Sequence, residues 1–261
     1  MPTHRLTELP ADALALITER TGPVLKYETA GSGLNSEIAA HVHTADTTLF
    51  VKGLRSGHPR IWTQAREAAI NPHVAGIAPA LLWRAEGHDW DLLAFEDADG
   101  RHADYTPGSP DLPHVADTLA RLSQLTAPAE VTLRTMPDRM REHTPDPALF
   151  DGHALLHTDW FPTNILITGD GVRVVDWAWA SRGAAWIDAA LWAVWLVRSG
   201  HNPEQAHQWA AGIPAYATAR PAAVAAFADA TVSVWEQITD GDAEPWTLDM
   251  LAAARTWQAS R

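Results

Sequence analysis

The chain has 261 residues, 46% of them hydrophobic, which is ordinary for a protein with a buried core and fits one large domain or two modest lobes. The formal net charge of -13 opposes binding to nucleic-acid phosphates and favours a cationic small molecule as partner. The absence of cysteine excludes disulfides and thiolate metal sites and fits a reducing compartment.

The first third of the chain is expected to form a small antiparallel sheet. A short helix over residues 10–20 is expected outside the sheet, and residues 61–70 are expected to form the main helix. Strands are expected at residues 24–29, 36–43, 47–53, 77–83 and 91–96. The turn between the first two strands contains Gly31, Ser32 and Gly33, which would let backbone amides approach an anionic group. A plain hairpin turn fits the same three residues.

Lys52 lies among apolar residues on the predicted strand 47–53, where a buried ammonium group requires an anionic partner. Glu67 lies on the predicted helix 61–70, fifteen residues beyond Lys52, and a solvated charge on the helix surface is its plain interpretation.

After residue 96 the sequence predicts a mainly helical region. The expected helices cover residues 115–125, 136–143, 184–198, 204–219, 222–239 and 246–259. Residues 184–197 are the most apolar stretch, but this stretch is short and carries Asp188, so we expect a buried helix and no membrane span. Residues 1–10 lack an apolar run of signal-peptide length, and we expect a soluble cytoplasmic protein that binds no membrane.

The segment 153–176 is expected to carry the chemistry. It predicts a loop, a strand, a tight turn and a second strand that ends on a carboxylate. Asp159, Asn164 and Asp176 would then converge near the mouth of one hairpin. Such oxygen-bearing side chains are the kind of ligand that Mg²⁺ prefers.

The pattern His157-x-Asp159-x-x-x-x-Asn164 followed by Asp176 resembles the catalytic and metal-binding loops of the aminoglycoside phosphotransferase family, relatives of the eukaryotic protein kinases. The sequence differs from the family at positions next to the motif residues, which are expected to serve packing. The family usually has Gly at the positions of Thr158 and Thr163 and His at the position of Phe161, and Asp-Trp-Ala at 176–178 replaces an Asp-Phe-Gly-like triplet.

The resemblance implies an α+β, protein-kinase-like two-lobed fold. An N-terminal nucleotide-binding lobe, residues 1–96, would hold the small antiparallel β-sheet and one main helix. A mostly helical C-terminal lobe, residues 97–261, would carry the catalytic loop and the acceptor site. The implied activity is transfer of the γ-phosphate of ATP, with GTP as an alternative, to a hydroxyl of a small molecule, for example an aminoglycoside or another antibiotic, as in antibiotic resistance.

The resemblance also implies a role for individual residues. Asp159 would accept the proton of the attacking hydroxyl, Asn164 and Asp176 would hold Mg²⁺, and Lys52 with Glu67 would orient the phosphates. Asp188 would support His157 and Asp159 from below. The nucleotide would further meet the glycine turn and the hinge backbone, at Gly31, Ser32, Gly33, Phe95, Glu96 and Ala98.

The acceptor is left open by these motifs. Related folds phosphorylate amino alcohols, sugars or peptide Ser/Thr side chains, and a nucleotide-binding module without turnover is a further alternative. The candidate acceptor contacts are either acidic or aromatic: Asp240, Asp242, Glu244 and Asp249 for a cationic acceptor, and Trp160, Trp177, Trp179 and Trp246 for a flat one. A solvated loop explains the acidic group equally well, and the sequence predicts no oligomeric state.

Three other kinds of site find little support in the sequence. It contains no GxxxxGK[ST], HExxH or GxSxG motif. His41 and His43 alternate on a predicted strand, which indicates a surface pair more strongly than a zinc site.

Overall fold

The computed structural model describes residues 8–30 and 36–261. The chain forms two compact units, one within Met1–Arg101 and Leu166–Ala178, the other comprising His102–Ile165 and Trp179–Arg261. The lobes expected at 1–96 and 97–261 stay a proposal about how nucleotide and acceptor binding are divided. The hairpin that follows the candidate catalytic loop belongs mostly to the first unit.

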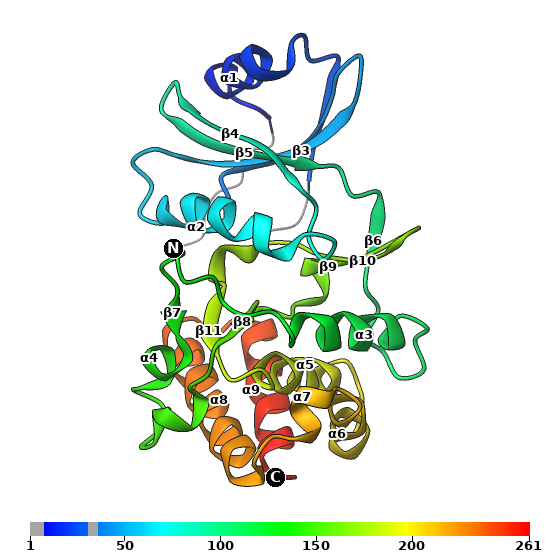
Figure 1. The fold of residues 1–261 in the computed structure, drawn as a ribbon, viewed down its shortest axis with the longest axis vertical. Coiled ribbons are helices and arrows are strands. Elements are labelled where there is room, and N and C mark those ends of the chain that lie inside the picture. Colours follow the sequence, from blue (N-terminus) through cyan, green and yellow to red (C-terminus); the bar gives the residue numbers. More distant parts are fainter. Residues whose placement is uncertain (1–7, 31–35) are drawn as a thin grey trace. The chain divides into compact units, whose positions relative to one another are not determined.

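The first unit contains a five-stranded antiparallel sheet in the order β1-β2-β3-β5-β4 (Figure 1). Its strands are β1 (Lys26–Thr29), β2 (Ile38–His43), β3 (Thr48–Arg55), β4 (Leu81–Gly87) and β5 (Trp90–Glu96). In the centre of the sheet β3 pairs with both β2 and β5, which places Lys52 opposite Ala39 and Leu93. The backbone of Lys52 therefore lies on an inner strand, which is paired with another strand on each side.

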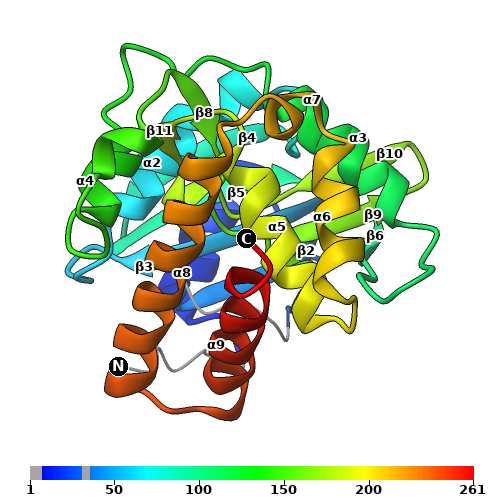
Figure 2. The same cartoon turned by 90° about the horizontal axis from the view of Figure 1, so that it is seen from below.

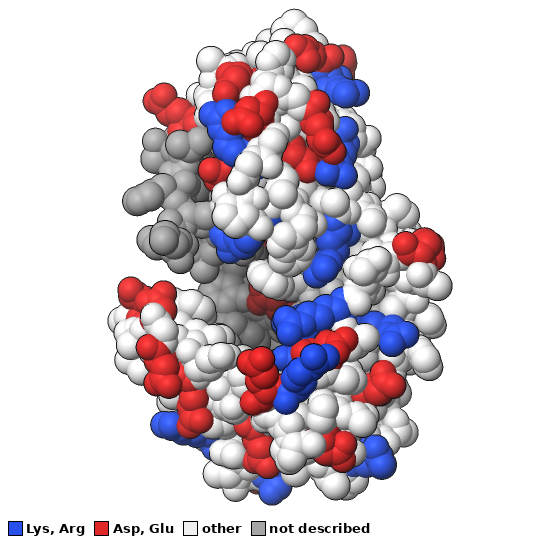
Figure 3. Space-filling model, turned by 90° about the vertical axis from the view of Figure 1, so that its left-hand side faces the viewer, with Lys and Arg blue, Asp and Glu red and all other residues white. Residues whose placement is uncertain are grey.

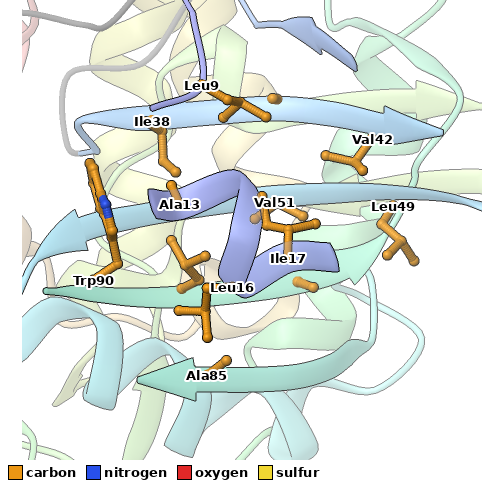
Figure 4. Packing of buried hydrophobic residues seen from close by; sticks show 13 residues of the cluster. Leu9, Ala13, Leu16, Ile17, Ile38, Val42, Leu49, Val51, Ala85 and Trp90 are labelled. Atoms are coloured by element: carbon orange, nitrogen blue, oxygen red, sulfur yellow. The ribbon is translucent and has the colours of Figure 1, made fainter. Parts of the chain in front are cut away.

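Helix α1 (Ala11–Thr21) covers one face of this sheet. Its apolar residues Ala13, Leu16 and Ile17 recur at helical spacing and pack on sheet residues such as Val51 (Figure 4). Together with their neighbours they form the hydrophobic core of the first unit: Leu9, Ala13, Leu16, Ile17, Ile38, Ala40, Val42, Leu49, Val51, Ala85, Trp90, Leu92 and Ala94. This core holds the central strand that carries Lys52.

The connection between α2 (Trp62–Ile70) and β4 differs from the expectation. The strand expected at 77–83 is present, but its bounds are wrong: the chain first forms the 3-10 helix η1 (Asn71–Val74) and a turn, and β4 begins only at Leu81. The Asn71 side chain fixes this turn, since its Nδ2 donates to the Pro79 carbonyl at 2.8 Å and its Oδ1 accepts the Leu81 N–H at 2.7 Å. Pro79 itself has no N–H to offer a sheet.

The candidate catalytic loop connects a strand of one small sheet to a strand of another. One has the order β10-β9-β6, with β6 (Gly100–His102), β9 (Ile165–Thr168) and β10 (Gly171–Val174). The other has the order β7-β11-β8, with β7 (Arg134–Thr135), β8 (Ala154–Leu156) and β11 (Ser181–Gly183). The loop leaves β8 and enters β9 through the 3-10 helix η3 (Pro162–Asn164), and η4 (Trp177–Trp179) precedes β11.

The second unit is mostly helical. Its helices are α3 (Leu112–Leu122), α4 (Met136–Met140), α5 (Ile187–Arg198), α6 (Pro203–Ala211), α7 (Pro214–Ala217), α8 (Pro221–Gly241) and α9 (Pro245–Gln258), with the 3-10 helix η2 (Pro147–Phe150). Helices α8 and α9 lie side by side as an antiparallel pair, and α5 packs against α9 and α6 (Figure 2). The apolar helix expected at 184–198 is present as α5.

The single helix expected at 204–219 is wrong. Helix α6 ends at Ala211 and is capped by Gly212, Ile213 has an extended backbone with φ -90 and ψ 120, and α7 starts at Pro214. Proline has no N–H to continue the α6 ladder but fits the first position of a new helix. Among the residues that the structure describes, no helix has the length and apolar character needed to cross a membrane.

Candidate active site

Lys52 is held by two carboxylates within the first unit. Its Nζ lies 2.6 Å from Oε2 of Glu67 on α2 and 3.2 Å from Oδ1 of Asp176. The Lys52 side chain is 10% exposed and that of Glu67 is 5% exposed, so the pair is almost fully removed from water. The ion pair between Lys52 and Glu67 predicted from the sequence is confirmed, and the contact with Asp176 is an addition that the sequence did not predict.

The buried charges shift one another's protonation. Burial alone would lower the pKa of Lys52, but the carboxylates of Asp176 and Glu67 outweigh burial and raise that pKa above its ordinary value. Burial raises the pKa of Glu67, and the Lys52 ammonium opposes this shift. The cluster thus joins a lysine cation to two carboxylates, and the attraction between the opposite charges counters the effect of burial on both Lys52 and Glu67.

Asp176 has a left-handed backbone with φ 66, a conformation that a residue with a side chain rarely adopts. The next residue helps to hold this turn, since the Trp177 N–H donates to Oε1 of Glu67 at 3.4 Å and the Trp177 indole donates to the Val174 carbonyl at 2.9 Å. Glu67 therefore contacts both Lys52 and the backbone just after Asp176.

The expected hinge leaves β5 beside this cluster. The Phe95 ring is buried, and the Lys52 Nζ lies 5.9 Å from its centroid. The Glu96 N–H already donates to the Ala80 carbonyl at 2.9 Å, so this amide is occupied within the sheet. Ala98 is half-buried. The glycine turn with Gly31, Ser32 and Gly33 lies outside the described residues.

The candidate catalytic loop in the second unit is fixed from α5. The buried Asp188 carboxylate accepts the backbone N–H of His157 at 2.8 Å and of Thr158 at 2.9 Å. Burial raises the pKa of Asp188, and the hydrogen bond from the His157 amide opposes this rise. The predicted support by Asp188 is confirmed for the backbone at His157 and Thr158.

Further hydrogen bonds hold the loop around Asp159. Its N–H donates to Nδ1 of the fully buried His157 at 3.2 Å. Its carbonyl accepts Nδ2 of Asn164 at 3.2 Å, so the amide side chain closes the loop. Burial and the negative charge of Asp159 raise the pKa of Tyr105 well above its ordinary value.

Two residues of this region were missed as functional candidates. Thr158 has φ 68, and its hydroxyl contacts the Arg139 guanidinium at 2.6 Å. The sequence signal for Thr158 was its departure from the Gly usual at this position in the family whose loop motif the sequence resembles. No sequence signal pointed to Arg139, because a short helix far from the loop in sequence brings it there.

The candidate acceptor residues differ in how far their side chains are exposed. Trp160 and Trp177 are 0% and 2% exposed, so the expectation that they stack on an acceptor is wrong: their rings fill the interior. Trp179 is half-buried, while Trp246 is 39% exposed and contacts Trp235 edge-on. The acidic candidates on α8, α9 and their connection are exposed: Asp240, Asp242, Glu244 and Asp249. On the face shown in Figure 3 acidic and basic side chains are interspersed.

His41 and His43 have nearby protein partners. His41 Nδ1 lies 2.6 Å from Oδ1 of Asp97, and His43 Nδ1 lies 3.0 Å from the Thr48 hydroxyl. Within residues 8–30 and 36–261 no cluster of three or more His, Cys, Asp or Glu side chains could hold a metal ion.

The site residues thus form two groups. Lys52, Glu67 and Asp176 belong to the first unit, and Asp159 and Asn164 belong to the second. The convergence of Asp159, Asn164 and Asp176 remains a prediction.

Solved structures resemble the chain over nearly its whole length. The choline kinase LicA of Streptococcus pneumoniae matches with a TM-score of 0.69 and 14% sequence identity, covering 95% of this chain and 99% of that one. The chain has the protein-kinase-like fold. A thermostable mutant of the aminoglycoside phosphotransferase APH(4)-Ia shares this fold with a TM-score of 0.61 at 14% identity, covering 92% of this chain and 98% of that one.

A microcompartment-associated aminopropanol kinase has the same protein-kinase-like fold, with a TM-score of 0.57 at 14% identity and coverage of 94% and 95% of the two chains. No protein-family model matches the sequence, and no curated protein matches it either. The α+β, kinase-like architecture expected from the sequence is confirmed.

Proposed function

We propose that the protein is an ATP-dependent phosphotransferase that moves the γ-phosphate to a hydroxyl group of a small molecule. The observation that carries this proposal is the buried Lys52 ammonium between Glu67 and Asp176 on a protein-kinase-like fold. Burying three charged groups costs desolvation energy that an apolar cluster of similar size avoids. A binding role for nucleotide phosphates explains why such a costly cluster stands on the central strand.

Each group then has a chemical task. Lys52 would orient the phosphates while Glu67 holds its ammonium in place, and the backbone of Phe95, Glu96 and Ala98 would meet the base. The carbonyl of Glu96 is the more suitable contact, since its N–H is already bound in the sheet. Gly31, Ser32 and Gly33 remain proposed phosphate contacts.

Asp159 would accept the proton of the attacking hydroxyl. Its backbone is fixed on both sides, by His157 and by Asn164, so its carboxylate needs little reorganisation to reach the reacting geometry. Catalysis of phosphoryl transfer rests mostly on such positioning and on charge stabilisation.

Asn164 and Asp176 fit Mg²⁺ by their chemistry. The Asn164 amide nitrogen donates to the Asp159 carbonyl, which leaves the amide oxygen as the ligand atom, and Asp176 offers a carboxylate. Hard oxygen donors of this kind, few in number, are what Mg²⁺ takes from proteins that bind it with phosphates. When bound, Mg²⁺ supplies charge neutralisation at the transferred phosphoryl group.

The acceptor class is open to the same alternatives as before: an aminoglycoside or other antibiotic, an amino alcohol, a sugar or a peptide Ser/Thr. Solved structures of the same fold include kinases of choline and aminopropanol and a ternary complex of APH(4)-Ia with ADP and hygromycin B. The exposed acidic residues of the α8–α9 connection favour a cationic acceptor, and Trp179 and Trp246 remain candidate stacking residues.

The decisive experiment measures phosphate transfer from Mg-ATP and from Mg-GTP to a panel of these acceptor classes by mass spectrometry. Asp159→Asn is the test variant, and Asp146→Asn, an exposed carboxamide change in the same unit, is the matched control. A phosphorylated product that persists with Asp146→Asn and disappears with Asp159→Asn supports the proposal. Mg-dependent nucleotide binding without any product across the panel would reduce the protein to a nucleotide-binding module.

A further inference from the structure

Thr158 directly precedes Asp159 and has a backbone conformation that threonine rarely adopts. Its φ of 68 lies in the left-handed region, where a β-branched residue is strained and glycine is not. Such strain persists only where surrounding contacts hold the residue in place. The contacts of Thr158 therefore show what the chain gains from a side chain at this position.

The Thr158 hydroxyl uses both its donor and its acceptor capacity. It donates to the Trp179 carbonyl at 3.0 Å and accepts Nη1 of Arg139 at 2.6 Å. The same Nη1 contacts the Trp179 carbonyl at 3.1 Å and the hydroxyl of the buried Ser181 at 2.9 Å. One guanidinium nitrogen from α4 thus joins the candidate catalytic loop to the segment that enters β11.

Trp179 and Ser181 lie just beyond the candidate metal ligand Asp176 in the chain. Three donors meet at the Trp179 carbonyl, from Thr158, Arg139 and Ser181, which ties this segment firmly to the loop. A glycine at 158 would relieve the backbone strain but would remove two of the loop's connections. The hydroxyl is thus the part of the side chain that makes both connections.

We propose that Arg139 is a positioning residue that acts through the Thr158 hydroxyl to hold Asp159 in its reacting position. The inference rests on the proposed phosphotransferase function. Asp188 fixes the backbone N–H groups of His157 and Thr158 from α5, while Arg139 fixes the Thr158 side chain from α4. The residue before the candidate base is thereby held through both its backbone and its side chain.

Three substitutions at Thr158 separate hydroxyl, shape and backbone strain. Thr158→Ser keeps the hydroxyl, Thr158→Val keeps the branched shape without it, and Thr158→Gly removes both and suits the left-handed backbone. We expect kcat of the serine variant within about threefold of the wild type and kcat of the other two lowered about 10- to 100-fold, because small displacements of a catalytic group cost rates of this order. The KM for Mg-nucleotide should stay within about twofold, since Lys52 and Glu67 are untouched.

The Arg139 variants test the other end of the contact. Arg139→Met should lower kcat as Thr158→Val does, and Arg139→Lys should recover part of the loss because an ammonium group also donates several hydrogen bonds. Arg141→Met is the matched control, since Arg141 follows α4, is exposed and pairs with Asp138 on the surface. Because Arg139 is proposed to act through the Thr158 hydroxyl, Arg139→Met combined with Thr158→Val should lower kcat by less than the product of the two single losses.

Hydrogen exchange of the amides of His157 and Thr158 gives a readout that needs no acceptor. We expect faster exchange in Arg139→Met and Thr158→Val and wild-type exchange in Thr158→Ser and Arg141→Met. If wild-type protein transfers phosphate to no acceptor while exchange changes in this pattern, the proposed function fails and the positioning contact stands. Wild-type kcat in Thr158→Val, multiplicative losses in the double variant, or unchanged exchange in Arg139→Met would each overturn the inference.

Discussion

The buried carboxylate of Asp188 accepts the backbone N–H of His157 at 2.8 Å, and a second N–H, from Thr158, at 2.9 Å. An ionised carboxylate offers acceptors to both amides, whereas an amide side chain offers one oxygen and presents its NH₂ to the other donor. The first turn of α5 therefore decides the backbone path of the loop that leads to Asp159.

Asp188→Asn should lower the free energy of unfolding by about 1 to 3 kcal/mol, because one buried backbone donor loses its acceptor. Chemical denaturation measures the loss, and Asp146→Asn, an exposed residue of the same unit, is the control. Phosphate transfer should fall together with stability. Equal stability of Asp188→Asn and wild type would mean that the loop finds another acceptor.

Lys52→Met should abolish most phosphate transfer and destabilise the first unit by up to about 5 kcal/mol, since two buried carboxylates then lose their cation. Lys26→Met is the control, because Lys26 is 65% exposed on β1. A phosphate-transfer assay and thermal unfolding measure the two effects.

The double variant Lys52→Met with Glu67→Gln distinguishes charge from packing. It removes one of the uncompensated carboxylates, so it should be more stable than Lys52→Met alone while transfer stays low. A double variant less stable than Lys52→Met would contradict this charge argument.

Lys52 should resist acylation at pH 9, where Lys26 reacts. The carboxylates of Asp176 and Glu67 raise the pKa of Lys52 above the ordinary 10.5, so the reactive neutral amine is scarcer at every lower pH. The stability that this charge contributes is accordingly present below 10.5 and is lost only as pH rises past the folded pKa. Peptide mapping by mass spectrometry after brief treatment with acetic anhydride gives both rates.

Glu67→Gln should accelerate acylation of Lys52, because one of the two carboxylates that raise its pKa is gone. Unfolding in urea should equalise Lys52 and Lys26. Equal labelling in the native protein would show that the cluster does not protect the ammonium.

Gly152→Ala should destabilise the second unit by about 1 to 3 kcal/mol through overpacking. A Cβ at this position would lie 2.4 Å from the Gly183 carbonyl oxygen and 2.7 Å from the Ala184 Cα, and backbone atoms cannot yield as a side-chain tip can. Gly57→Ala is the control, since its Cβ would meet nothing within 4 Å. Denaturation midpoints of the two variants should differ clearly, and equal midpoints would mean that β8 and β11 separate at little cost.

The sequence by itself determined the fold class and the order of the candidate site. Apolar patterns placed Lys52 on a buried strand and Glu67 on a helix, and the resemblance to a kinase-like family supplied their pairing, which the structure confirms. The roles of Asp159 and Asn164 rest on the same resemblance and stay predictions. The support role of Asp188 was also implied by the resemblance, in keeping with the need of a buried carboxylate for hydrogen-bond donors.

The tertiary structure alone decided which residues meet through contacts distant in sequence. Lys52 contacts Asp176 across 124 positions, and Arg139 reaches Trp179 across 40. It also decided the burial of Trp160 and Trp177, because tryptophans that fill a core and tryptophans that could stack on a ligand have the same local sequence signal. Periodicity reports which face of an element is apolar, whereas the partner that covers that face is set by packing of the whole chain.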